Sequence, residues 1–126
     1  MVAVRFCDIE IYPSGNSIWQ DKWSEGLVHT NHALTPDWAP QESYVLTDSC
    51  RRLDRARQLF QENLGHLSVQ VIQEILADHD GKPAGICRHG AEGMYSISGY
   101  IAEAEKRLLH VRRGLGCKGQ WKTYEV

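Results

Sequence analysis

Two groups of polar residues in this chain have side chains that could carry out chemistry. The first is the run His29-Thr30-Asn31-His32, and the second comprises Asp78-His79 and Cys87-Arg88-His89. The amide of Asn31 can donate an N–H to an oxyanion that develops in acyl transfer, and Arg88 carries a fixed positive charge that suits a place beside a nucleophile or a carboxylate. The alternative is structural, because an Asn after a strand commonly caps a turn and an Arg beside a His commonly forms a surface ion pair.

The same two groups contain the residue types that bind zinc. Imidazole and thiolate are the usual zinc ligands, and four of them could come from a set of five residues: His29, His32, His79, Cys87 and His89. The chain has neither an H-E-x-x-H helix nor a C-x-x-C pair, and on a strand His29 and His32 would project to opposite faces. The spacing therefore predicts no metal site, and a small zinc protein is kept as an alternative.

Length and composition describe one globular domain. The chain has 126 residues, of which 42% are hydrophobic and 24% charged, and this excludes a disordered or low-complexity polymer. The net charge is -2 and the basic residues are not pooled, which disfavours a nucleic-acid partner. No apolar run approaches the roughly 20 residues that cross a bilayer, and no secretory signal is visible. We therefore expect a cytoplasmic protein without a membrane partner, whose cysteines are free thiols.

Strand patterns occupy the first part of the chain. Val2 to Ile11 is rich in β-forming residues and is followed by the turn residues Pro13 to Asn16, which predicts a strand and a hairpin turn. Gly26 to His32 is short and partly β-branched, which predicts a second strand leading into an irregular loop with Pro36 and Pro40.

Two helices and a second hairpin follow. Helical spacing predicts a helix from Asp48 to Leu64, stopped by Gly65, and another that opens at Ser68 and closes before Asp80. Alternating residues over 95–101 and the segment 108–111 predict the hairpin. Regular βαβ alternation is absent, so we expect an α+β fold with the helices layered on antiparallel sheet.

Four segments together resemble a known enzyme family. They are Gly26 to His32, Asp48 to Arg52, Ile75 to His79 and Ile86 to His89. In order and approximate spacing they are similar to the C-terminal half of the acyl-coenzyme A:6-aminopenicillanic-acid acyltransferase family, whose members are isopenicillin N acyltransferase-like cysteine amidohydrolases. The closing stretch, from Ser96 through Cys117 to the tail Trp121–Val126, also looks like that family's last hairpin and tail, so the resemblance covers nearly the whole chain.

The resemblance implies a fold and a chemistry. The family belongs to the N-terminal nucleophile hydrolases, which have a four-layer αββα sandwich and expose a cysteine nucleophile by self-cleavage. It implies that Asn31 is the oxyanion-hole asparagine and that Arg88 organises the nucleophile's pocket. No metal or organic cofactor is implied, and an acyl-coenzyme A donor is compatible with the resemblance. Supporting roles are expected for five further residues: His29, Thr30, His32, Asp78 and His89.

The chain departs from the family pattern in its cysteines and in its pocket. The family's nucleophile lies well upstream of the His-Thr-Asn-His motif, whereas only 30 residues precede Asn31. Cys7 lacks the small neighbours of a self-cleavage site, and Cys50 is expected to pack as a small apolar side chain. Ala33 and Gly116 stand where the family commonly has a bulky aromatic residue and a proline, which alters the expected pocket.

We therefore expect residues 1–126 to form a single partial domain, the C-terminal portion of an acyltransferase or amidohydrolase domain that acts on an amide through an acyl-cysteine. Part of a sandwich cannot cover its inner faces, so the expected partner is an N-terminal half that carries the nucleophile, or a second copy of the chain. The alternative is an inactive binding or structural subunit that retains the scaffold.

Overall fold

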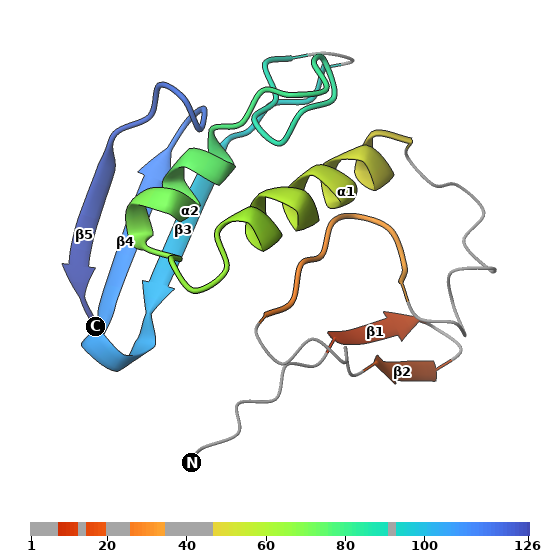
Figure 1. The fold of residues 1–126 in the computed structure, drawn as a ribbon, viewed down its shortest axis with the longest axis horizontal. Coiled ribbons are helices and arrows are strands. Elements are labelled where there is room, and N and C mark those ends of the chain that lie inside the picture. The colour runs from red at the N-terminus through yellow and green to blue at the C-terminus, as the bar shows by residue number, and fades with distance from the viewer. Residues whose placement is uncertain (1–7, 13–14, 20–25, 35–46, 91–92) are drawn as a thin grey trace.

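The computed structural model describes residues 8–12, 15–19, 26–34, 47–90 and 93–126. The elements are, in chain order, β1 (Asp8–Tyr12), β2 (Gly15–Trp19), α1 (Thr47–Glu62), α2 (Val69–Leu76), β3 (Ser98–Glu103), the 3-10 helix η3 (Ala104–Lys106), β4 (Leu108–Arg113) and β5 (Trp121–Glu125). The expected α+β class is confirmed, since two helices accompany antiparallel sheets (Figure 1). In the described part of the chain, no helix has the length and apolarity that crossing a bilayer requires.

The first hairpin consists of β1 and β2, which pair antiparallel from Asp8 opposite Trp19 to Tyr12 opposite Gly15. The expected first strand is found over Asp8–Tyr12, and the remainder of that prediction, together with Pro13, lies outside the described residues. The residues Gly15 and Asn16, which the sequence suggested as part of the turn, already belong to β2. This strand was not expected, because its sequence, Gly-Asn-Ser-Ile-Trp, begins with turn-forming residues.

The prediction of a second strand over Gly26–His32 is wrong. The segment 26–34 carries no strand and runs as irregular chain beside α1 (Figure 1). The reason is visible in its hydrogen bonds, because the Asn31 backbone N–H donates to the Ser49 side chain rather than to a neighbouring strand. Gly26 allows the segment to approach the helix, since a Cβ there would lie 2.2 Å from Cζ of Phe60.

Both helices are confirmed close to their expected limits. α1 begins at Thr47, buries Leu53 and ends at Glu62, and Gly65 follows with a φ of 78° that suits glycine. α2 begins after Ser68, whose side chain accepts a hydrogen bond from the Val71 N–H at 3.2 Å. This is the ordinary N-cap interaction.

The second sheet has the order β3-β4-β5 and is antiparallel throughout. The expected hairpin is confirmed as β3 and β4, although β3 begins only at Ser98. β5 was missed, because the strand is largely exposed and so lacks a hydrophobic alternation. α2 lies against this sheet (Figure 1), close enough that a Cβ on Gly116 would lie 2.1 Å from the Leu76 carbonyl oxygen.

The inner side of β4 is polar. His110 and Arg112 are both buried, and the Arg112 guanidinium lies 5.2 Å from the centre of the Trp121 ring. The His110 ring contacts the Thr123 hydroxyl and the Glu103 carboxylate, both at 2.9 Å. Hydrogen bonds from Lys106 and His110 hold the pKa of Glu103 below its ordinary value.

Candidate functional site

The Ser49 hydroxyl joins the first turns of α1 to the loop that carries Asn31. Ser49 is 1% exposed, and its Oγ accepts the Asn31 backbone N–H at 2.8 Å. The hydroxyl donates to Thr30 Oγ1 at 3.1 Å, and the Thr30 hydroxyl in turn donates to the Ser49 carbonyl at 3.0 Å. These bonds fix the conformation of the loop against the helix.

The same serine also contacts the ring of His32. His32 Nδ1 lies 2.9 Å from Ser49 Oγ and 3.3 Å from Thr30 Oγ1. His32 Nε2 lies 3.8 Å from Cys50 Sγ. The supporting roles expected for Thr30 and His32 stay predictions. Both residues contact Ser49, as residues that hold the Asn31 loop against α1 would.

The amide of Asn31 is oriented by a cation. Its Oδ1 accepts a hydrogen bond of 2.8 Å from Arg52 Nη2. Because a guanidinium has only donors, the atom that faces it must be the oxygen, and the amide N–H group therefore points away from Arg52. A charge-assisted bond to the amide oxygen polarises the group and strengthens its N–H as a donor. Asn31 is exposed, so this N–H group is accessible.

Arg88 is connected to Asn31 through two residues of α1. Its guanidinium forms an ion pair with Asp48, and the Asp48 carboxylate also lies 3.5 Å from Arg52 Nε. The Arg88 backbone is held by Ser96, whose hydroxyl accepts the Arg88 N–H at 2.9 Å. The structure therefore brings the two predicted catalytic residues into one polar network, in which a single carboxylate bridges two guanidinium groups.

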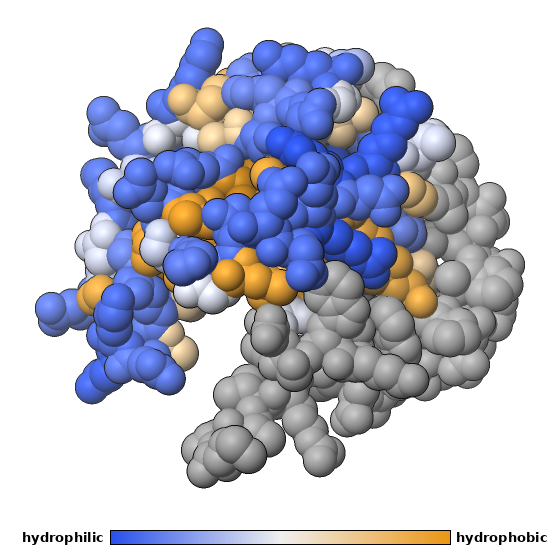
Figure 2. All heavy atoms as spheres, in the orientation of Figure 1, coloured by the Kyte–Doolittle hydropathy of each residue, from blue (hydrophilic) through white to orange (hydrophobic). Residues whose placement is uncertain are grey.

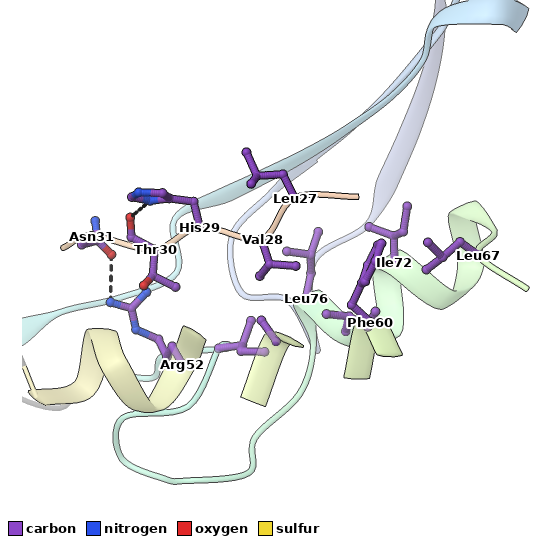
Figure 3. Close-up of a pocket in the computed structure, with 13 residues that line it drawn as sticks. Leu27, Val28, His29, Thr30, Asn31, Arg52, Phe60, Leu67, Ile72 and Leu76 are labelled. Carbon is purple, nitrogen blue, oxygen red and sulfur yellow. Dashed lines mark hydrogen bonds between the residues drawn. The ribbon is translucent and has the colours of Figure 1, made fainter. Parts of the chain in front are cut away.

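A cleft of about 660 Å³ opens beside this network, between the segment 26–34 and the two helices (Figure 3). Asn31 and Arg52 lie at one end, together with His29, whose Nδ1 donates to the Thr30 carbonyl. Thr30 also lines this end, and the remaining lining residues are apolar: Leu27, Val28, Ala56, Phe60, Leu67, Ile72, Ile75, Leu76 and Ile86. A volume of this size is typical of pockets for small organic ligands. Hydrophobic side chains are also visible across the middle of the molecule where α1 and α2 meet (Figure 2).

Asp78 joins the end of α2 to α1. Its carboxylate accepts two hydrogen bonds from Arg55, from Nε at 3.1 Å and from Nη2 at 2.9 Å. This paired arrangement lowers the pKa of Asp78 and raises that of Arg55. The Asp78 carbonyl also accepts the Cys87 N–H at 2.9 Å. Asp78 therefore contacts the connection between the helices and the strand region rather than the cleft.

His89, the remaining candidate, lies in a separate group of histidines and cysteines. His89 Nε2 lies 2.8 Å from His79 Nε2 and 3.6 Å from Cys87 Sγ. Cys117, which sequence reasoning did not connect with this group, places its Sγ 3.3 Å from the same His89 nitrogen. Desolvation, followed by the neighbouring His79 and two lysines, lowers the pKa of His89. Of the five zinc ligands considered from the sequence, His79, Cys87 and His89 lie together, whereas His29 and His32 are not part of this group.

Sequence reasoning missed the residues that hold the candidate catalytic groups. Asp48, Ser49 and Arg52 were noted as part of a helix start and of one family-like segment, without a role, although they supply the contacts to Asn31 and Arg88. A signal was present, because Asp and Ser at a helix start offer polar atoms in the first turn.

The expectation of free thiols is met by the three described cysteines, Cys50, Cys87 and Cys117, while Cys7 lies outside the described residues.

The family model described as acyl-coenzyme A:6-aminopenicillanic acid acyl-transferase matches residues 5–104, which is more than half of the chain. The chain belongs to this family. A comparison with curated proteins gave no match.

Membership in the acyltransferase family confirms the resemblance drawn from the four motifs, all of which lie within the matched residues. The α+β arrangement is consistent with part of an N-terminal nucleophile hydrolase fold. Membership points to acyltransferase or hydrolase activity. The match ends at residue 104, so the likeness of the segment 114–126 to the family's tail stays a prediction.

Proposed function

We propose that this chain supplies the oxyanion-binding part of a cysteine N-terminal nucleophile hydrolase or acyltransferase that cleaves amide bonds. The observation that carries the proposal is the anchoring of Asn31. Its backbone is held by Ser49 and its side-chain oxygen by Arg52, while its N–H group is left available beside an apolar cleft. A pre-oriented donor of this kind stabilises a charge that develops during reaction without having to reorganise.

The proposed reaction runs through an acyl-cysteine. A thiolate attacks the amide carbonyl carbon, and the carbonyl oxygen, now negative, accepts a hydrogen bond from the Asn31 amide. The intermediate collapses, the C–N bond breaks, and the amine leaves with the proton that the α-amino group of the nucleophilic cysteine had taken from the thiol. Water then releases the acyl group as an acid, or a second amine accepts it in transfer. A coenzyme A thioester could supply the acyl group in place of an amide.

The lining of the cleft supports an apolar acyl group as the part of the substrate that is bound. Nine aliphatic or aromatic residues line the cleft beyond its polar end. Burying one methylene group contributes about 0.8 kcal/mol, so a medium-length acyl chain would gain several kcal/mol there. In the proposal, the carbonyl of that chain lies at the polar end, where Asn31 can reach it.

Arg88 is proposed to organise the nucleophile's pocket through Asp48. Its guanidinium forms an ion pair with that carboxylate, and Arg52 shares the same carboxylate, so two positive charges face one negative charge. A second partner with a negative charge, such as a thiolate, would therefore compete with Asp48 or join it at the guanidinium. Supporting roles are proposed for Thr30 and His32, which hold the loop, and for His29, Asp78 and His89.

The nucleophile is proposed to come from residues outside this chain, in an N-terminal half, with a second copy of this chain as the other proposed partner. Among the described cysteines, Cys87 is 1% exposed, Cys117 Sγ lies 3.3 Å from His89 Nε2, and Cys50 lies within α1 with its Sγ 3.8 Å from His32 Nε2. Ile97 and Tyr100, each 76% exposed, are apolar side chains that a further segment could cover. Free thiols at the described cysteines fit the cytoplasm, which we propose as the location.

The test is purification of the tagged chain from its native host. The proposal expects a second chain that begins with cysteine, or a longer product that contains both parts, and expects the material to cleave amides with apolar acyl groups. Mass spectrometry after rapid mixing with substrate should detect an acyl group on that cysteine. A folded chain without a cysteine partner and without amide cleavage would overturn the proposal and favour an inactive binding or structural subunit.

A further inference from the structure

Four metal-binding side chains converge between the end of α2 and the turn after β4. They are His79, Cys87, His89 and Cys117, and their ligand atoms all lie within 4.8 Å of one another. The group contains two imidazoles and two thiols and no carboxylate. Imidazole nitrogen and thiolate sulfur are the donors that zinc prefers in four-coordinate sites, whereas magnesium and calcium prefer oxygen. We propose that these four residues bind one Zn²⁺ ion.

The distances suit a tetrahedral ion. With Zn–N bonds of about 2.05 Å and Zn–S bonds of about 2.3 Å, ligand atoms around zinc are roughly 3.3 to 3.8 Å apart. His89 Nε2 lies 3.3 Å from Cys117 Sγ and 3.6 Å from Cys87 Sγ. The two imidazole nitrogens, 2.8 Å apart, need to separate by about half an ångström, which small rotations of the rings supply.

The fold brings these residues together from distant parts of the chain. His79 follows the C-cap of α2, and the nearby Cys87 backbone N–H donates to the Asp78 carbonyl at 2.9 Å, which fixes the two segments beside each other. Cys117 is delivered by the turn in which Gly116 packs against Leu76 of α2. A side chain at Gly116 would collide with the Leu76 carbonyl and move Cys117 away. The four ligand residues are therefore brought together by contacts of the backbone, and not only by their own side chains.

The proposed site has the features of a structural zinc site rather than a catalytic one. Four protein ligands fill the tetrahedron and leave no position for water or substrate, which distinguishes structural from catalytic zinc. Cys87 is buried, while His89 and Cys117 are exposed and border the solvent, so the ion can enter from the surface. A hollow of about 240 Å³ lined by Cys87 and His89, with Lys82 and Pro83, leads to the group.

The ion would also fix the position of Arg88. Arg88 is the residue between the ligands Cys87 and His89, and its side chain forms the ion pair with Asp48. Zinc would tie this segment to α2 and to the turn after β4, and so hold the guanidinium in place. The zinc site does not depend on the proposed enzyme activity, since its evidence is the four side chains themselves.

The experiment uses the full chain with Zn²⁺ and Co²⁺ alone. Metal analysis after dialysis against a weak chelator should find about one zinc per chain. Replacement by Co²⁺ should give the intense visible bands of a tetrahedral ion together with a thiolate-to-cobalt charge-transfer band. Removal of zinc by a strong chelator should lower the melting temperature. These measurements on the native chain do not depend on whether a variant folds.

Single variants of the ligands identify the site. Cys87→Ser, Cys117→Ser, His79→Ala and His89→Ala should each reduce bound zinc to less than about a tenth of the native level after the same dialysis. The matched controls Cys50→Ser and His66→Ala change residues outside the group and should retain about one equivalent. A folded native chain that binds neither metal, a disulfide between Cys87 and Cys117 in place of free thiols, or full zinc retention by Cys117→Ser would each overturn the proposal.

Discussion

Replacing Ser49 with alanine tests how the Asn31 loop is held. The Ser49 hydroxyl is buried and takes part in three hydrogen bonds, to the Asn31 N–H, to the His32 ring and to the Thr30 hydroxyl. A hydrogen bond contributes about 1 kcal/mol net. Because Asn31 is exposed and its N–H can regain water, we expect Ser49→Ala to lower the free energy of unfolding by about 2 kcal/mol rather than 3.

The assay is urea unfolding followed by circular dichroism. With a slope of about 2 kcal/mol/M, a loss of 2 kcal/mol moves the midpoint by about 1 M. Ser98→Ala is the matched control, because Ser98 is exposed on β3, and a surface change of this kind should stay within about 0.5 kcal/mol. If the midpoints of Ser49→Ala and Ser98→Ala coincide, the serine does not hold the loop and the reasoning is refuted.

Two further predictions concern the helices. Arg55 lowers the pKa of Asp78, so this pair stabilises the fold fully above the ordinary aspartate pKa of about 4 and is lost as the pH falls through the lowered value. Between pH 7 and pH 3 the native chain should therefore lose more free energy of unfolding than Asp78→Asn, and equal losses would contradict the assignment. Ser68→Ala removes the cap on the Val71 N–H and should cost about 1 kcal/mol in urea unfolding, whereas no change in the midpoint would show that the cap is not stabilising.

The elements that the sequence predicted well are those with local signals. Ser68 and Gly65 mark helix limits through interactions within a few residues, and both limits agree with the structure. The hairpin of β3 and β4 is likewise a contact between neighbours in the chain. Such features depend on propensity, capping and periodicity, which can be read from a short window of sequence.

The features that the sequence did not predict depend on distant contacts. The segment 26–34 has a strand-like composition, but the partner of its backbone is the side chain of Ser49, 18 residues further along from Asn31. Cys117 lies 28 residues from His89, and only the packing of the turn after β4 against α2 brings the two together. No spacing rule connects residues that meet through the packing of a helix on a sheet.

In the candidate site, too, the sequence predicted the residues with local motifs but not the contacts between distant parts of the chain. Asn31 and Arg88 were identified from their motifs, whereas the path that connects them runs through Arg52 and Asp48 and required the position of α1. Their chemical roles are still proposals. The family and the α+β class are confirmed, and the polar network around Asn31 gives the proposed chemistry a definite geometry to test.

The most direct test of the central claim is the turnover of Asn31→Asp in the assembly purified from the native host. The aspartate keeps an oxygen for Arg52 but removes the N–H that would stabilise the oxyanion. The account predicts that kcat falls by about 10²- to 10³-fold with little change in KM, because the bond forms mainly in the transition state. Gln120→Glu, an amide-to-acid change at an exposed position, should leave kcat unchanged. A kcat for Asn31→Asp that equals that of the native assembly would contradict the account.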